Sequence, residues 1–185
     1  ESLGSSSHSV VARRDEREMH ITCASSDPFV LRDNVAALLD MPPSRVRVHV
    51  EPGPCPIAGR MLFPMLMAGH AALLARVSAG QVRLVYTQKE CLAYTPKRPP
   101  CEARYRSALD ADGNLAAMEV ELDFDAGAYP VFSAEVVERA LLAACGGYRC
   151  DHVRVRARLL ASSRPPSGTF SGCGEPQVFF ALERH

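Results

Sequence analysis

Apolar and polar residues alternate in several short stretches of the chain, and each stretch predicts a β-strand. Residues 45–50 read RVRVHV, so the three valines would face one side while Arg45, Arg47 and His49 face the other. Such alternation is typical of a strand with one buried face. The other stretches that predict strands are residues 8–25, which would form two strands joined by a charged turn, 81–88 and 151–162.

The strongest pattern of this kind lies in the middle of the chain. Residues 101–129 read CEARYRSALDADGNLAAMEVELDFDAGAY, two long alternating segments on either side of Asp110–Gly113. Asp and Gly favour the positive φ angles that a tight turn between antiparallel strands requires. The pattern predicts a long antiparallel hairpin at about 101–125.

Apolar residues at helical spacing predict helices near 28–40, 61–78 and 133–145. Asp27 would cap the first and Pro28 would occupy its first turn, while Ser133 would cap the third. The helix at 61–78 is so apolar that we expect burial on most sides. Because these helices mix with strands without regular alternation, the predicted class is α+β, and residues 1–185 are expected to form a single domain.

Composition excludes some functions. The 21 basic and 21 acidic residues leave no net charge, which gives no support for nucleic-acid binding, and no apolar run is long enough for a membrane span. The seven cysteines include no CxxC pair, so no metal site is predicted, and without a signal peptide they indicate reduced thiols in a cytoplasmic protein. Since the chain opens on Glu1 rather than Met, we expect an excised piece of a larger protein.

Three loops rich in proline and glycine connect the predicted elements. Residues 52–60 read PGPCPIAGR, residues 96–100 read PKRPP and residues 165–176 read PPSGTFSGCGEP. Glycines between a strand and a helix let the backbone approach a flat or anionic ligand, whose charge the helix N-terminus favours. We therefore predict that the loops at 55–60, 96–100 and 168–174 converge on one side.

The last loop and the end of the hairpin resemble known motifs. Residues 165–183, PPSGTFSGCGEPQVFFALE, are similar to Pro-x-Gly-Ala-Phe-Arg-Gly-x-Gly-x-Pro-Gln followed by a helix, and the hairpin ends in Gly-Ala-Tyr at 127–129. GPCPIAGR at 53–60 stands where the same family has Gly-Gly-Gly-Phe-Gly-Gly-Lys. In this order, over nearly the whole chain, the sequence resembles the molybdenum-cofactor-binding subunit of the xanthine dehydrogenase/aldehyde oxidase family, the molybdenum hydroxylases.

The resemblance implies an oxidoreductase parent that hydroxylates an N-heterocycle or an aldehyde with oxygen from water. The implied cofactor is molybdopterin, and the implied partners are the rest of the molybdenum subunit and iron–sulfur and flavin domains or subunits. No catalytic residue is expected in this chain, because the family's glutamate base lies in a later Gln-Gly-x-Gly segment. The isolated chain is therefore expected to be inactive and without cofactor, and its exposed apolar surface would allow a homo-oligomer.

The resemblance also assigns site residues by position. The expected substrate-binding residues are Met61, Arg98, Cys173 and Gly174. The expected cofactor-binding residues are Ser26, Ile57, Ala58, Gly59, Phe170, Ser171 and Gly172.

Several of these positions depart from the family pattern. Ser26 replaces a glutamine, Ser171 replaces the arginine of Phe-Arg-Gly, and Cys173 replaces an aromatic residue. A hydrogen bond from a charged donor such as arginine is worth roughly 1.5–3 kcal/mol. These losses favour a second hypothesis, a non-catalytic relative that serves in assembly or scaffolding. A third is an independent thiol enzyme with Cys173 as its nucleophile, although no histidine stands at a recognisable partner spacing.

Overall fold

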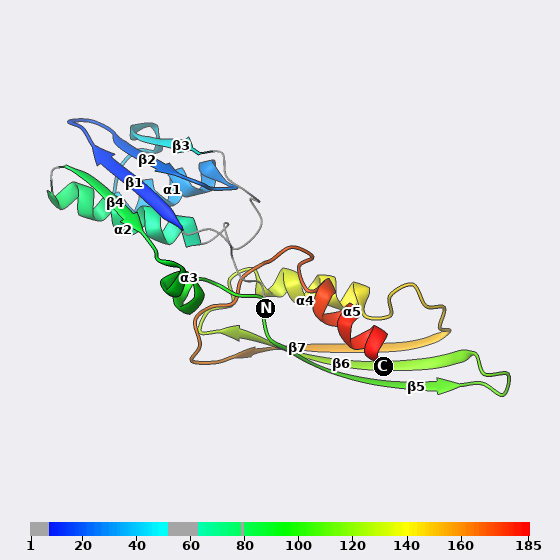
Figure 1. Cartoon of the computed structure of the whole chain (residues 1–185). Coiled ribbons are helices and arrows are strands. Elements are labelled where there is room, and N and C mark those ends of the chain that lie inside the picture. The colour runs from blue at the N-terminus through cyan, green and yellow to red at the C-terminus, as the bar shows by residue number, and fades with distance from the viewer. Residues whose placement is uncertain (1–7, 52–62, 79) are drawn as a thin grey trace. The chain divides into compact units, whose positions relative to one another are not determined.

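The computed structural model describes residues 8–51, 63–78 and 80–185 (Figure 1). It divides into two compact units, Glu1–Pro96 and Lys97–His185, and each is described by itself. The loop predicted at 55–60 lies outside the described residues. Residues 61 and 62 of the helix predicted at 61–78 also lie outside them.

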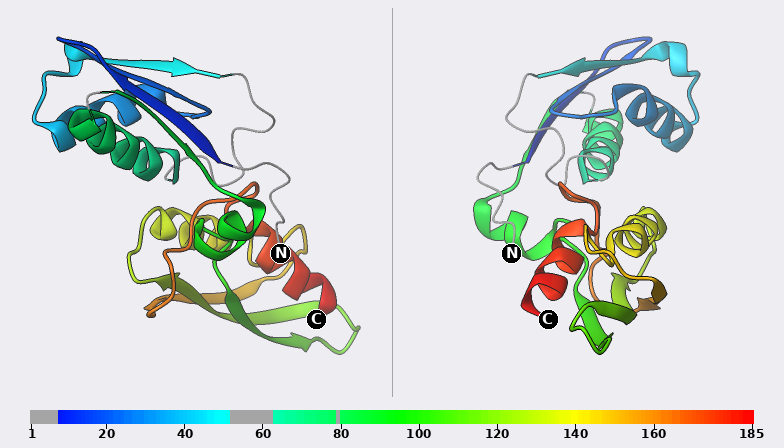
Figure 2. Two further views of the ribbon diagram at one scale, coloured as in Figure 1. Left: turned by 60° about the vertical axis from the view of Figure 1, so that its left-hand side comes forward. Right: turned by 90° about the vertical axis from the view of Figure 1, so that its right-hand side faces the viewer.

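The first unit is a four-stranded sheet in the order β3-β2-β1-β4, with α1 and α2 packed on one face (Figure 2). Strand β1 is antiparallel to β2 and β4, whereas β2 and β3 are parallel. All the strands predicted in this part of the chain are present, although the one predicted at 81–88 ends at Val85 and Gln88 begins a helix. Its elements are β1 (Ser9–Arg14), β2 (Met19–Cys23), α1 (Pro28–Leu39), a 3-10 turn (Pro43–Arg45), β3 (Val46–Val50), α2 (Phe63–Ser78), β4 (Gln81–Val85) and α3 (Gln88–Tyr94).

Helix α1 begins as its sequence predicts. The Asp27 carboxylate accepts a hydrogen bond from the backbone N–H of Val30 at 3.3 Å, and Pro28 occupies the first turn. The helix ends at Asp40, whose φ of 51° is left-handed. Its inner side joins the alternate residues of β1 and β2 in one apolar core, in which Ala12, Ile21 and Leu31 are fully buried.

Two expectations about burial in this unit are wrong. Helix α2 is not buried on most sides: it exposes Leu66, Leu74 and Val77, the last to 85%. Only one face of the helix packs on the sheet, and its composition does not reveal which sides are covered. In β3 only Val46 is fully buried, while Val50 is 46% exposed, because β3 lies at the edge of the sheet.

The second unit is a three-stranded sheet in the order β5-β6-β7, with α4 and α5 on one face (Figure 1). The predicted hairpin is confirmed: β5 and β6 are antiparallel, and Gly113 in their turn has a φ of +83°. Helix α4 connects β6 to β7, and these two strands are parallel. The elements are β5 (Cys101–Leu109), β6 (Leu115–Gly127), α4 (Ser133–Ala143), β7 (His152–Ala161) and α5 (Glu175–Arg184).

The two faces of this second sheet differ sharply in character. Val120, Leu122 and Phe124 of β6 are buried against the two helices. On the other face, Glu119 and Glu121 of β6 stand opposite arginines of both β5 and β7, and Asp123 forms a bidentate ion pair with Arg158 of β7. This alternation is why the strands could be recognised in the sequence.

One helix start differs from its prediction. Phe132, with a φ of 55°, stands at the N-cap of α4, and Ser133 is the first helical residue. The Ser133 hydroxyl donates to the carbonyl of Val131 at 3.4 Å and caps no helical N–H. Both units nevertheless combine helices with mixed sheets, so the predicted α+β class is confirmed. No helix among the described residues is long and apolar enough to cross a membrane.

Candidate functional site

The glycine-rich loop turns sharply just before helix α5. The backbone N–H of Cys173 donates to the carbonyl of Phe170 at 2.8 Å, and that of Glu175 donates to Gly172 at 2.9 Å, so two turns follow each other. Three consecutive residues have positive φ: +83° at Gly172, +36° at Cys173 and +99° at Gly174. Such a path favours glycine, and a cysteine within it is uncommon.

Both glycines are also required by the packing of the loop. A Cβ on Gly172 would lie 2.7 Å from the ring of Pro176, and a Cβ on Gly174 would overlap the carbonyl oxygen of Val136 in α4. The motif predicts that these glycines allow close approach of a cofactor. The structure supplies a further reason within the chain: Gly174 lets the start of α5 lie directly against α4.

Arg98 connects this loop to the segment before strand β5. Its Nη2 donates to the carbonyl of Ser171 at 2.8 Å, and its Nη1 donates to Oε1 of Gln177 at 3.5 Å. The guanidinium carbon lies 5.8 Å from the centroid of the Phe170 ring, within the range of a cation–π contact. The backbone N–H of Gly168 donates to the carbonyl of Lys97 at 2.9 Å. Two of the three predicted loops are thus joined within the second unit.

Gln177 also belongs to this cluster, although it is not among the predicted site residues. It lies in the first turn of α5, and its Nε2 donates to the carbonyl of Pro99 at 3.1 Å. The signal available in the sequence was the glutamine that closes the glycine-rich motif. Phe170 is 6% exposed, in keeping with packing under the loop.

The outer side of the loop offers hydrogen-bond donors. Ser171 and Gly172 are exposed, and within the described part of the chain no acceptor is found for either backbone N–H. Gly174 stands at the N-cap of helix α5, which has no side-chain cap. Unpaired N–H groups beside a helix N-terminus favour an anion. The half-buried Arg98 adds a positive charge at the same place.

The remaining predicted site residues are not brought to this cluster by any described contact. Ser26 is exposed between β2 and α1 in the first unit. Ile57, Ala58, Gly59 and Met61 lie outside the described residues. The convergence of all three loops therefore stays a prediction. Arg98, expected to contact substrate, donates hydrogen bonds from two of its nitrogens to Ser171 and Gln177.

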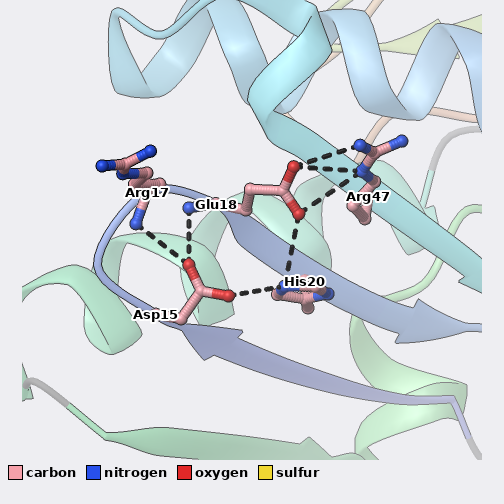
Figure 3. A network of polar contacts seen from close by, with 5 residues as sticks. All are labelled: Asp15, Arg17, Glu18, His20 and Arg47. Carbon is pink, nitrogen blue, oxygen red and sulfur yellow. Dashed lines mark hydrogen bonds and ion pairs between the residues drawn. The ribbon is translucent and has the colours of Figure 1, made fainter.

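A second polar cluster, at the turn between β1 and β2, was not predicted (Figure 3). Asp15 accepts hydrogen bonds from the backbone N–H of Arg17 and Glu18 and from the ring of His20, and Glu18 pairs with Arg47. Ligand-type atoms of Asp15, Glu18 and His20 lie within 4.8 Å of one another. The backbone N–H of Glu18 is the main cause that lowers the Asp15 pKa to about 2. Because these carboxylates already have donors in the chain, the cluster is explained as a network that stabilises the turn.

Comparison with known proteins gives the loop cluster its context. Residues 6–185 match the family described as the molybdopterin cofactor-binding domain. The chain belongs to this family. The resemblance to the xanthine dehydrogenase/aldehyde oxidase enzymes, drawn from the motifs, is thereby confirmed.

The molybdopterin cofactor-binding domain has relatives among large oxidoreductases. It is 29% identical over 174 residues to aldehyde oxidase 3 of Mus musculus, covering 94% of this chain and 13% of that protein. It is 29% identical over 164 residues to the nicotinate dehydrogenase large molybdopterin subunit of Eubacterium barkeri, covering 89% of this chain and 38% of that subunit. The chain thus spans well under half the length of these relatives.

A solved structure shares the fold of this domain. The aldehyde oxidoreductase of Desulfovibrio gigas is similar with a TM-score of 0.82 at 23% sequence identity, covering 95% of this chain and 19% of that one. At this identity the likeness supports the fold, and the expected architecture, one part of a molybdenum-cofactor-binding domain, is confirmed.

Proposed function

We propose that this chain is part of a molybdenum hydroxylase and contributes one wall of its molybdopterin and substrate site. The observation that carries the proposal is the junction of the 97–100 and 168–174 segments, where exposed backbone N–H groups stand beside Arg98. Membership of the molybdopterin cofactor-binding domain family supports it.

The residues of the glycine-rich loop fit an anionic cofactor. Ser171 and Gly172 present backbone N–H donors. The buried Phe170 ring packs under the loop, and Arg98 supplies positive charge. The molybdenum cofactor, when bound, would supply the chemistry that transfers oxygen from water to a carbon next to nitrogen or to an aldehyde carbon. This chain's own part is to bind and orient: Phe170, Ser171 and Gly172 toward the cofactor, and Arg98, Cys173 and Gly174 toward the substrate.

The other four predicted cofactor contacts belong to the first unit. Ser26, Ile57, Ala58 and Gly59 would complete the cofactor wall and Met61 would contact substrate, by their positions in the motifs. The rest of the molybdenum subunit, together with iron–sulfur and flavin domains or subunits, would complete the parent enzyme. A cytoplasmic location belongs to the same proposal.

One observation favours a second candidate function. Ser171 stands where the motif has an arginine, so the charged side chain of that position is missing. Arg98 donates a hydrogen bond to the backbone carbonyl of Ser171. If the other substituted anchors also fail to hold the cofactor, the protein would be a non-catalytic relative that serves in assembly.

Metal and pterin analysis of the full-length parent, purified from its own host, separates the two functions. Molybdenum measured by plasma mass spectrometry, with pterin fluorescence, should show about one of each per chain if the site is loaded. Absence of both, in a preparation where a sister hydroxylase is loaded, would replace the enzyme proposal with the assembly role. In that case, recovery of pterin in the Ser171→Arg parent would identify the lost arginine as the cause.

A further inference from the structure

Gln177 lies where the segment before β5 meets the start of α5. Its side-chain amide donates to the carbonyl of Pro99 and accepts from Arg98. Because a backbone carbonyl can only accept and a guanidinium can only donate, these two partners fix which way the amide is turned. Both polar atoms of the Gln177 amide therefore have hydrogen-bond partners in the chain.

Arg98 carries this constraint to the exposed part of the loop. Its Nη1 donates to Oε1 of Gln177 at 3.5 Å, its guanidinium lies over the buried ring of Phe170, and its Nη2 donates to Ser171 at 2.8 Å. An arginine side chain loses considerable rotamer freedom when it is fixed, so a partner that holds its planar fork favours the bond to Ser171.

The bond to Ser171 determines the direction of the next backbone donor. The carbonyl of Ser171 and the N–H of Gly172 belong to one planar trans peptide, in which they point in opposite directions. With the carbonyl directed to Arg98, the N–H of Gly172 is directed away from it, on the side where the described residues offer no acceptor.

The two ends of the loop are fixed separately. The backbone N–H of Gly168 is bonded to Lys97, and Gly174 lies against Val136 of α4. Between these points, the middle of the loop has its own turn bond from Cys173 to Phe170 and the bond from Arg98. Arg98 therefore ties the middle of the loop to the segment before β5.

We propose that Gln177 is a positioning residue: acting through Arg98, it sets the Ser171–Gly172 peptide so that the loop has its binding conformation before the cofactor arrives. The proposal rests on the proposed function in one respect, namely that the N–H of Gly172 serves molybdopterin. Its structural part concerns this chain alone and can be tested without the cofactor.

Amide hydrogen exchange of the 185-residue chain tests the structural part. In Gln177→Leu, the Cys173 amide should exchange about tenfold faster than in the wild type, as expected for losing hydrogen bonds that hold the turn. Amides of β6 should be unchanged. Gln88→Leu, the same change at an exposed site in the first turn of α3, should leave Cys173 unaffected. Equal acceleration in β6, or none at Cys173, would overturn the proposal.

A double-variant cycle tests whether Gln177 acts through Arg98. Arg98→Met alone should accelerate exchange at Cys173 at least as much as Gln177→Leu, and the double variant should be no faster than Arg98→Met. Gln177→Glu, whose carboxylate still accepts from Arg98 but cannot donate to Pro99, should restore part of the protection. Additive effects of the two single variants would show that Gln177 acts independently and would contradict the proposal.

The cofactor arm uses the full-length parent. Gln177→Leu should lower its pterin content by about tenfold relative to wild type at equal protein yield, with Gln88→Leu unchanged. If the wild-type parent holds no pterin while Cys173 exchange responds as expected, the proposed function fails and the positioning role stands. If the parent is loaded and Gln177→Leu changes neither pterin content nor exchange, the positioning role fails alone.

Discussion

Arg158 and Asp123 face each other across strands β7 and β6 and share two hydrogen bonds, Nε to Oδ1 and Nη2 to Oδ2, each 2.7 Å long. This bidentate geometry is the strongest form of a surface ion pair. The hydrogen bond from Arg158 is the main cause that lowers the Asp123 pKa below its ordinary value.

We expect Arg158→Gln to lower the melting temperature at pH 7 and low salt by a few degrees, because β7 loses its bidentate ion pair to β6. Arg156→Gln, on the same face of the same strand, is the matched control, since no ion pair of Arg156 is found among the described residues. The difference between the variants should shrink in 1 M salt. Equal melting temperatures at low salt would show that the pair contributes nothing to stability.

Acid should remove the contribution of the Asp15 carboxylate to the free energy of unfolding. Its pKa is lowered to about 2 in the fold, so its charge stabilises the protein above pH 4, and this stabilisation is lost as the pH falls from about 4 to about 2. Asp15→Ala should therefore destabilise the chain at pH 7 and make little difference near pH 2. Urea titrations at the two pH values measure this, with Asp112→Ala in the exposed hairpin turn as control. A constant effect of Asp15→Ala at both pH values would contradict the assignment.

Alkaline pH should weaken both units through their thiols. Burial raises the pKa of Cys23 and of Cys101 to about 11. Both thiols favour the fold below the ordinary thiol pKa near 9, and this advantage is lost as the pH rises from 9 through 11. Unfolding free energy should fall over this window, and less steeply in Cys23→Ala and Cys101→Ala. Thiolate absorbance at high pH gives an independent reading, and its appearance near pH 9 at these sites would contradict the prediction.

Replacing Gly174 should be far more costly than replacing Gly113, although both have positive φ. Gly113→Ala costs only the backbone strain of about 1 kcal/mol, because nothing lies within 4 Å of the added Cβ. Gly174→Ala also overlaps the carbonyl of Val136, and we expect a further loss of about 2 kcal/mol or more. Denaturant unfolding of the two variants compares them directly, and similar losses would show that α5 can shift away from α4 at little cost.

Much of the fold could be predicted from the sequence because the determining signals are local. The Asp27-Pro28 start of α1 and the Gly113 turn depend on residues adjacent in the chain, and both occur as expected. Strand direction is not local: β7 alternates as clearly as β5, yet it is parallel to β6 because α4 returns the chain to the same end of the sheet. No alternation pattern distinguishes these cases.

The candidate site was predictable in outline only. Motif positions drew attention to Arg98 and to the loop at 168–174, but the contact between them joins residues 73 positions apart. Gln177, which closes the network, acts through side-chain hydrogen bonds that no spacing rule reveals. The overlap that makes Gly174 indispensable arises from α4, an element whose position against the loop emerges only in three dimensions.

Both units begin with a hairpin, continue through a helix and place a third strand parallel to the second strand of that hairpin. In the first unit, β1 has a further neighbour, β4, which follows only after both helices. On a ribosome, β1 and β2 can therefore pair long before β4 is synthesised. During that interval one edge of β1 remains open to other nascent chains, and translation speed across α2 sets how long this hazard lasts.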